Sequence, residues 1–326
     1  MEEILPNLYR IEIPLPNTPL KSLNSYLIKG HERNLVVDTG LNLDECLVAM
    51  RSSLNDLGVD LRKTDFFITH AHADHFGLVP ELVTDKSVVY CSTQDAGVFE
   101  PVHDNSAIWN SLKSFSILHG FPEKDIREAM ERHPGYSYTG PANRINISFI
   151  KEGDAISAGD YTFECIETPG HSRGHLCLYE PNHRILIAGD HILADITPNI
   201  SLWSPNENPL KDYLNSLDKI LGCNIELVLP GHRSLIKEWR KRIVELKQHH
   251  DKRVIEILTI LEKENQDAYQ AASRMTWDMS YKTWNLFPLT QKLFATWEAI
   301  AHLKYLEEKR LIERVSDGEK FVFKLS

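Results

Sequence analysis

Four side chains that can bind a metal ion lie within residues 70–75, which read His-Ala-His-Ala-Asp-His. They directly follow the apolar run 66–69, which reads as a buried strand. Imidazoles and a carboxylate crowded at a strand end are costly to desolvate, and the imidazoles repel one another when charged. A divalent cation removes both costs, because neutral imidazole and carboxylate are zinc ligands. The alternative is a solvated, histidine-rich surface loop.

Three further strand-like stretches each end at a glycine-containing turn that carries another ligand-type side chain. The turns are Pro169-Gly170-His171, Gly189-Asp190 and Pro230-Gly231-His232. Loops held by a rigid sheet commonly carry functional groups, and glycine lets the backbone turn tightly and approach an ion. One such turn is ordinary. Three of them beside the first cluster favour a metal site over a surface loop.

The number of candidate ligands indicates how many ions the site holds. There are seven, namely His70, His72, Asp74, His75, His171, Asp190 and His232. A single catalytic zinc ion uses about three protein ligands. Two ions about 3.5–4 Å apart that share a carboxylate would use all seven. Because metal-bound water loses its proton near neutral pH, no separate general base is required.

In this order and at this spacing, the motifs resemble those of the metallo-β-lactamase superfamily, and most of all its glyoxalase II-like hydrolases. The segment Ser25–Ile28 and the turn Asp38-Thr39-Gly40 also resemble the first hairpin and the Asp-Thr-Gly turn of this family. The resemblance covers roughly residues 5–240. It implies an α/β fold, a four-layer αββα sandwich of the α+β kind, and a competent site, since no ligand position is substituted.

The resemblance also implies a role for each ligand. One metal ion would be held by His70, His72 and His171. The other ion would be held by Asp74, His75 and His232. Asp190 would bridge the two ions together with a hydroxide, which Asp74 would help to orient. The expected cofactor is a pair of Zn²⁺ ions, with iron or manganese as alternatives. Asp38 would either accept a hydrogen bond from a ligand imidazole or simply close its turn.

These roles predict a metal-dependent hydrolase in which the bridging hydroxide attacks an electrophilic carbonyl. A thiolate or alkoxide leaving group needs less help from an acid than an amide nitrogen does, and the sequence shows no obvious extra acid. We therefore expect a thioester, ester or lactone of a small acyl compound rather than a β-lactam. One alternative is a phosphodiesterase or ribonuclease on the same fold. Another is a protein that is not a hydrolase: either an oxidoreductase that resembles the mononuclear-iron persulfide dioxygenases, or a regulatory protein that only senses through its winged-helix-like tail.

Charge separates the chain into two parts. Residues 1–239 carry 20 Lys and Arg against 33 Asp and Glu, a net of −13, whereas residues 240–326 carry 16 against 13, a net of +3. An acidic catalytic region disfavours nucleic acid, which is bound largely through cationic contacts to phosphate. A small-molecule acyl substrate is the expected partner.

The sequence also bears on location. The N-terminal residues lack the basic and apolar regions of an export signal, and no stretch approaches the roughly 20 apolar residues of a membrane span. The five cysteines are scattered and never spaced as Cys-x-x-Cys. We therefore expect reduced thiols and a cytoplasmic protein without a membrane anchor.

We predict a catalytic domain over residues 1–239, with strands at 7–13, 23–38 and 87–91 and helices at 44–57 and 77–83. A helical insertion at about 94–142 would either cap the site and shape an apolar pocket or merely add to the core. Candidate substrate contacts, in the insertion and beside Asp190, are His119, Tyr136 or Tyr138, and His191.

A second domain is predicted over residues 240–326. Helices at 236–261, 267–274 and 291–309 precede two strand-like runs, 311–315 and 320–324, that flank an Asp-Gly turn. Three helices followed by a β-hairpin resemble a winged-helix domain. Reading DNA would require cations along one helix face, but lysines and glutamates balance along 291–309. We expect this domain to pack on the catalytic domain or to form a homodimer.

Overall fold

The fold comes from a computed structural model and is described for all residues except 17, 100–105, 137–143, 203, 205, 279–280 and 317. The chain forms two compact units. Unit 1 comprises Met1–His103, Thr139–Pro198 and Asn215–Ile243, and unit 2 comprises Asp104–Tyr138, Asn199–Leu214 and Val244–Ser326. Residues 104–138, which interrupt unit 1 in the sequence, therefore belong to the same unit as the C-terminal tail.

Unit 1 contains a seven-stranded sheet in which the strands follow chain order. Its strands are β1 (Glu2–Leu5), β2 (Leu8–Leu15), β3 (Lys21–Ile28), β4 (Asn34–Val37), β5 (Thr64–Phe67), β6 (Val89–Cys91) and β7 (Ile147–Phe149). The pairs from β1 to β4 are antiparallel, and those from β4 to β7 are parallel. All four residues of β5 are buried, as expected for a strand of a parallel sheet covered on both faces.

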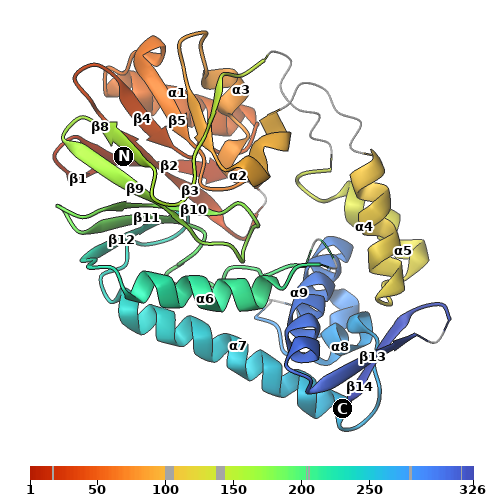
Figure 1. Ribbon diagram of the computed structural model, residues 1–326. Coiled ribbons are helices and arrows are strands. Elements are labelled where there is room, and N and C mark those ends of the chain that lie inside the picture. Colours follow the sequence, from red (N-terminus) through yellow and green to blue (C-terminus); the bar gives the residue numbers. More distant parts are fainter. Residues whose placement is uncertain are drawn as a thin grey trace. The chain divides into compact units, whose positions relative to one another are not determined.

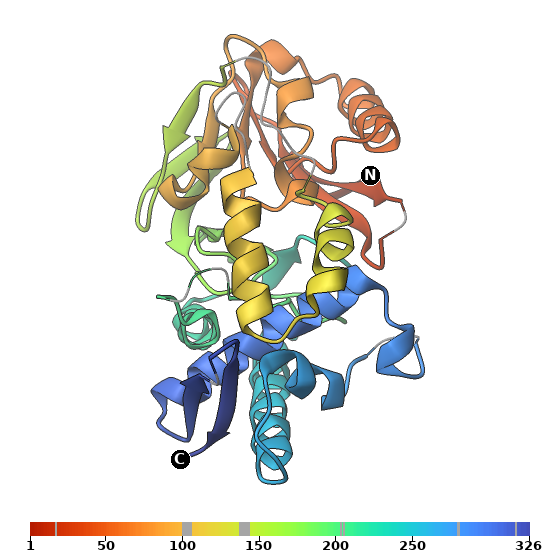
Figure 2. The same cartoon turned by 90° about the vertical axis from the view of Figure 1, so that its right-hand side faces the viewer.

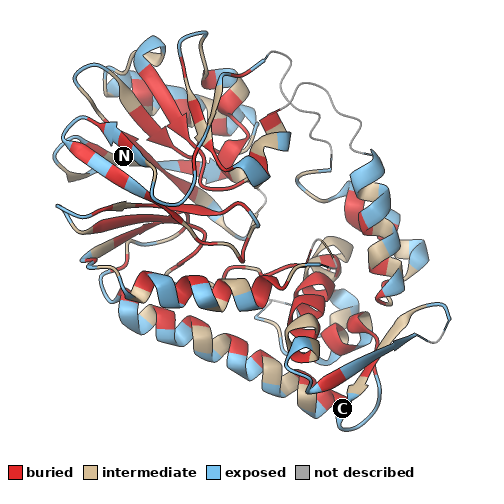
Figure 3. Cartoon of the chain, viewed as in Figure 1, coloured by how far each residue is buried: buried red, intermediate tan, exposed pale blue. Residues whose placement is uncertain are grey.

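A second sheet of unit 1 has the order β12-β11-β10-β9-β8. Its strands are β8 (Ala155–Ala158), β9 (Tyr161–Glu167), β10 (Leu176–Glu180), β11 (Ile185–Gly189) and β12 (Leu227–Pro230). Apolar residues of both sheets form one buried cluster that includes Tyr26, Phe67, Phe163 and Leu178. The core of unit 1 therefore lies between the two sheets (Figure 1), and Figure 3 shows how strongly burial concentrates in these strands.

Helices cover the outer faces of the two sheets. Helix α1 (Asp44–Asp56) packs on β2 and buries Cys46, Met50 and Leu54, one side chain per turn. Short helices α2 (Ala73–Phe76) and α3 (Val79–Leu82) and the 3₁₀ turns η1 (Leu61–Lys63) and η2 (Thr93–Phe99) complete this side. On the second sheet, Lys219 of α6 (Pro209–Leu221) donates to the carbonyl of Glu167 in β9. The predicted four-layer α/β fold is confirmed.

Unit 2 is mainly helical. Its elements are α4 (Ser106–Leu118), α5 (Glu123–Glu131), most of α7 (Trp239–Leu261), α8 (Ala268–Arg274), η3 (Trp284–Leu286), α9 (Leu289–Glu308), β13 (Ile312–Ser316) and β14 (Phe321–Leu325). Figure 2 shows α4 and α5 side by side, and both α5 and α8 pack on α9. The helices and hairpin occur in the predicted order. That the tail is winged-helix-like stays a prediction, and Asp317 of its turn lies outside the described residues.

Three sequence-based boundaries need correction. The helix predicted at 77–83 is only α3, and it is separate from α2, because the amide of Leu78 donates to the carbonyl of Gly40 instead of continuing α2 and because Pro80, at the start of α3, has no amide proton. The strand predicted at 23–38 is β3 and β4, joined by a turn. The long helix begins at Trp239 instead of 236, because Ile236 forms a β-bridge with Val228. Among the described residues no helix is long and apolar enough to cross a membrane.

Candidate metal centre

The candidate ligands lie at strand ends of unit 1. Strands β9, β11 and β12 run in one direction, since β10 is antiparallel to both β9 and β11, and β11 is parallel to β12. The turns after these three strands therefore meet at one edge of the second sheet, and they carry His171, Asp190 and His232. The segment 70–75 follows β5 of the first sheet and continues into α2.

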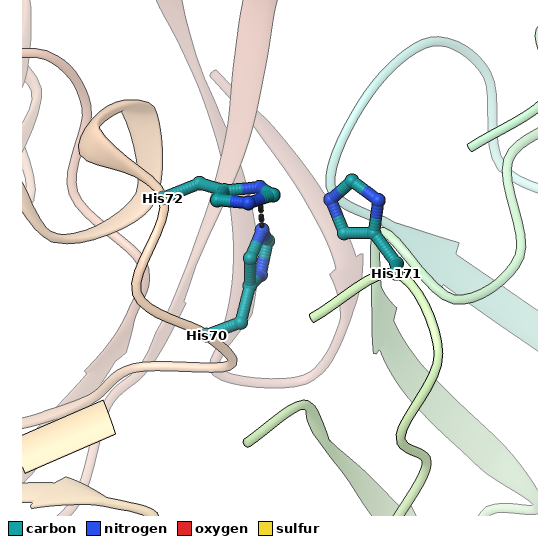
Figure 4. Close-up of side chains that lie close together, drawn as sticks. All are labelled: His70, His72 and His171. Atoms are coloured by element: carbon teal, nitrogen blue, oxygen red, sulfur yellow. Dashed lines mark hydrogen bonds between the residues drawn. The ribbon is translucent and has the colours of Figure 1, made fainter. Parts of the chain in front are cut away.

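Three imidazoles form the first group of ligands. Nε2 of His70 and Nδ1 of His72 are 2.9 Å apart. The ring of His171 lies 4.5 Å from that of His72 and 4.9 Å from that of His70, centre to centre. Figure 4 shows the three rings converging from two different loops, and one nitrogen of each lies close enough to the others for all three to share an ion.

A second group combines a carboxylate with two imidazoles. Oδ2 of Asp74 lies 3.4 Å from Nε2 of His232 and 4.0 Å from Nε2 of His75. Ligand atoms that bind one zinc ion tetrahedrally at about 2.0–2.1 Å lie roughly 3.4 Å from one another. Among the described residues, three groups have ligand atoms close enough to share an ion: these two, and a third that combines His70, His75 and Asp190.

Asp190 lies between the two groups and turns one oxygen to each. Its Oδ2 is 3.5 Å from Nε2 of His171, and its Oδ1 is 3.5 Å from Nε2 of both His75 and His232. The carboxylate is almost fully buried. A single side chain can therefore contribute a ligand to both sets.

Two imidazoles of the first group, His70 and His72, are uncharged at neutral pH. Burial and the neighbouring imidazoles hold the pKa of His70 well below its usual value. Burial, followed by the charge of His171, lowers the pKa of His72 to about 3. Both rings therefore offer lone pairs at neutral pH, which is the form that binds metal ions.

The second group is rich in charge. Burial alone would lower the pKa of His75, but the carboxylates of Asp38, Asp190 and Asp74 outweigh it and raise that pKa well above the usual value. Burial likewise opposes ionisation of Asp74, yet His75 and His232 bring its pKa down to about 2. Metal binding here would displace protons from imidazoles and leave the carboxylates to balance the charge of the ion.

The donor atoms fit a metal pair. Nε2 of His75, Nε2 of His232 and Oδ1 of Asp190 are buried without a hydrogen-bond partner among the described residues. Buried polar atoms in this state are rare and costly. Oδ1 of Asp190 faces each of the two nitrogens at 3.5 Å. A divalent cation would satisfy all three atoms, and nitrogen with oxygen donors suits zinc, iron or manganese.

Asp38 accepts a hydrogen bond from one of the candidate ligands. Its Oδ2 accepts from Nδ1 of His75 at 2.8 Å and from the hydroxyl of Thr69 at 2.8 Å, while its Oδ1 accepts from the Thr69 amide at 2.9 Å. A proton on Nδ1 leaves Nε2 of His75 free to face Asp190. Asp38 adopts a left-handed backbone conformation with φ of 58°, which costs of order 1 kcal/mol and is common at functional sites.

Two supports were not evident from the sequence. Nδ1 of His232 donates to the carbonyl of Ser22 at 2.7 Å, and the side chain of Asn24 donates to the carbonyls of Pro230 and Arg233, on either side of His232. Ser22 and Asn24 lie in β3, 206 or more positions before these partners, so no local motif reveals them.

His175 makes a local hydrogen bond and also supports the site. Its Nδ1 pairs with the hydroxyl of Thr168 at 2.8 Å, and its Nε2 accepts from the backbone amide of Asp190 at 3.1 Å. The ring therefore holds the backbone of the candidate bridging carboxylate in place.

The candidate substrate contacts lie in different surroundings. His191 is fully buried in unit 1, with its ring 6.1 Å from that of His175. His119 and Tyr136 belong to unit 2. Nδ1 of His119 donates to the carbonyl of Phe115 at 2.8 Å, and the ring of Tyr136 packs on Trp109 at 5.0 Å. Tyr138 lies outside the described residues. Contact with substrate stays a prediction for all of them.

Replacing Asp38 with Asn is expected to weaken metal binding by about 10–100-fold, the usual loss for a partner of a ligand. An amide nitrogen at the Oδ2 position would face the Nδ1 proton of His75 and favour moving it to Nε2, where it blocks the ligand atom. Competition with a chromophoric chelator measures the affinity. Asp65→Asn is the matched control, since Asp65 is a buried acid of β5 that pairs with Arg33. Unchanged affinity in Asp38→Asn would contradict the orienting role.

Comparison with known proteins is consistent with this geometry. Residues 19–232 match the family model described as Metallo-beta-lactamase superfamily. The crystal structure of metallo-beta-lactamase family protein TTHA1429 from Thermus thermophilus superposes with a TM-score of 0.79 at 28% identity, over 99% of this chain and all of that one.

Two curated proteins are similar in sequence. The probable metallo-hydrolase YqjP of Bacillus subtilis is 28% identical over 319 residues, which are 92% of each protein. The acyl-coenzyme A thioesterase MBLAC2 of Gallus gallus is 28% identical over 219 residues, which are 64% of this chain and 72% of that protein. Both relatives are named as hydrolases, and the name of the second specifies a thioester substrate.

Proposed function

Because the chain belongs to the metallo-beta-lactamase superfamily and is a metal-dependent hydrolase, we propose that it binds two divalent metal ions and hydrolyses a thioester of a small acyl compound. The observation that carries the proposal is the position of Asp190. Its two oxygens face two separate groups of ligand atoms, each at 3.5 Å. A one-ion site would give the second oxygen and the Asp74 group no function.

In this proposal each of the two ligand groups binds one metal ion. His70, His72 and His171 would hold one ion as neutral ligands, and Asp74, His75 and His232 would hold the other. Two bound zinc ions would lower the pKa of a water molecule and polarise the substrate carbonyl. The carboxylate of Asp74, 3.4 Å from His232, would orient the attacking water. Asp38 and His175 would keep His75 and Asp190 in position.

The choice of a thioester rests on leaving-group chemistry and on one relative. A thiolate departs without a proton from the protein, and the sequence shows no obvious extra acid that would protonate a leaving group. The relative named an acyl-coenzyme A thioesterase supports this choice. The excess of acidic residues in 1–239 disfavours a polyanionic RNA substrate.

The test is a substrate panel assayed with zinc-loaded protein whose metal content has been measured. We expect acyl-coenzyme A thioesters to be cleaved with kcat/KM at least ~10-fold above that for lactones and for a nitrophenyl phosphodiester. This ratio corresponds to a difference of about 1.4 kcal/mol in the stabilisation of the transition state. Free thiol is followed with a chromogenic reagent. Chelated protein and His72→Ala serve as controls. Fastest cleavage of the phosphodiester would overturn the proposal in favour of a phosphodiesterase.

A further inference from the structure

Asp95 is a buried acid of unit 1 to which neither the ligand motifs nor the proposed function assigns a task. It lies in η2, only 8% exposed, shortly after β6. Its carboxylate accepts hydrogen bonds from the backbone amide of Ala71 and from the hydroxyl of Ser92. Burial of this group is unfavourable enough to raise its pKa to about 7. Among the described residues, the donors that hold this buried acid are uncharged, so its burial calls for an explanation.

One contact of Asp95 is with the first ligand segment. Its Oδ2 accepts from the amide of Ala71 at 3.0 Å. Ala71 is the single residue between His70 and His72. This bond therefore fixes the backbone from which both imidazoles extend. Among the described residues, Asp95 alone offers this amide a hydrogen-bond acceptor.

A second contact is with the segment that follows His171. A Cβ placed on Gly174 would lie 2.4 Å from Oδ1 of Asp95 and 2.1 Å from Oγ of Ser92. The backbone of Gly174, three residues after His171, thus packs directly against the carboxylate of Asp95. Asp95 therefore touches both loops whose imidazoles converge in Figure 4.

We propose that Asp95 is a positioning residue of the metal centre, which holds the loop of His70 and His72 in register with the loop of His171. This inference rests on the proposed two-metal function and extends it to a residue outside the ligand set. It gives the buried side chain a role: one oxygen accepts the hydrogen bond of the Ala71 amide at 3.0 Å, while the other lies against Gly174. It also explains why position 174 is glycine, since any side chain would displace the carboxylate.

The test compares Asp95→Ala with Asp95→Asn in a zinc titration against a chromophoric chelator. In Asp95→Ala we expect one of two zinc equivalents to bind about 10–100-fold more weakly, while the other, held by Asp74, His75 and His232, keeps its affinity. Asp95→Asn retains an oxygen that can accept from Ala71, so its two affinities should stay close to those of the wild type. A general loss of stability would not affect one equivalent selectively.

Gly174→Ala provides a second variant in case Asp95→Ala does not fold. The backbone at Gly174 is not left-handed, so alanine adds only the clash with Asp95 and Ser92. We expect the same selective loss of one equivalent. Gly97→Ala is the matched control, because a Cβ at Gly97, in the same η2 turn as Asp95, meets no atom within 4 Å.

The outcomes separate the two proposals. Wild-type affinities in both Asp95→Ala and Gly174→Ala would overturn the positioning role and leave the two-metal function standing. Equal weakening of both equivalents, or an Asp95→Asn variant as weak as Asp95→Ala, would also overturn it. A wild-type protein that binds no zinc, iron or manganese would overturn the proposed function together with this role.

Discussion

Replacing Asp190 with Asn is expected to abolish hydrolysis and to lower the metal content of the purified protein below two ions per chain. The amide keeps the size of the side chain and the backbone bond to His175, but it loses the charge and offers only one acceptor oxygen. Since both oxygens of Asp190 face ligand groups at 3.5 Å, one group loses a ligand. Activity should fall by more than ~100-fold. Loss of a residue that only hydrogen-bonds a metal ligand costs up to about 100-fold, and Asp190 would itself be a ligand.

Metal content is measured by elemental analysis and hydrolysis by release of thiol. Asp160→Asn is the matched control, because Asp160 is an exposed acid of unit 1 in the turn between β8 and β9. His72→Ala should remove a ligand from the first group alone. An Asp190→Asn variant that holds two ions and hydrolyses thioesters at the rate of the wild type would show that Asp190 does not bridge.

Replacing Glu298 with Gln is expected to stabilise the protein at pH 8 by about 3 kcal/mol. This is the free energy that corresponds to the raised pKa of the Glu298 carboxyl group. Glu298 is buried in α9 of unit 2, where its Oε2 accepts from the side chain of Asn199 at 2.8 Å. Burial raises its pKa from 4.5 to about 7, although Arg253 and the bond from Asn199 act in the opposite direction. The charged form is therefore unfavourable in the folded state.

The direction of the pH dependence follows from proton binding. Between pH 4.5 and 7 the folded state keeps a proton that the unfolded state has released, so rising pH lowers the free energy of unfolding. The loss is complete above pH 7, and a difference of about 2.5 pKa units corresponds to about 3 kcal/mol. Glutamine stays neutral and keeps an oxygen for Asn199, so the variant escapes this loss. Below pH 4.5 the two proteins should be equally stable.

Urea unfolding of both proteins at about pH 4.5 and pH 8, with metal removed from both, measures the difference. Glu313→Gln is the control, because Glu313 is an exposed acid of β13 that pairs with Lys324 at the surface. It should change stability by less than about 0.5 kcal/mol at either pH. A Glu298→Gln advantage that is the same at both pH values would mean that the carboxyl does not titrate as described.

Much of the fold and of the candidate site could be predicted because the signals are local. Helix α1 was evident from its apolar spacing, and the ends of β5, β9, β11 and β12 from apolar runs that stop at turns. The boundaries that differed depended on contacts with residues outside the segment that carried the pattern. Ile236 forms a β-bridge with Val228 instead of starting α7, and the amide of Leu78 donates to the carbonyl of Gly40 instead of continuing α2.

The division of the chain was decided in the same way. Residues 104–138 and 244–326 are far apart in sequence, yet they belong to one compact unit. Ser116 of α4, for example, accepts a hydrogen bond from the indole of Trp297 in α9 at 2.9 Å. A hydrogen bond between two such distant residues produces no hydrophobic periodicity in either segment. Sequence patterns therefore assigned the two segments to separate domains.

By itself the sequence determined the chemistry available to this protein: histidines and aspartates at metal-ligand spacing, placed where strands end. Side-chain type and local turn geometry are properties of a few neighbouring residues, which is why they could be read directly. Only the tertiary structure decided that Asp190 lies between two ligand groups, and that Asp38, Asn24, His175 and Asp95 contact the ligand loops. Those relations depend on strand direction and on hydrogen bonds between residues as far as 209 positions apart, and they exist only after the two sheets have packed.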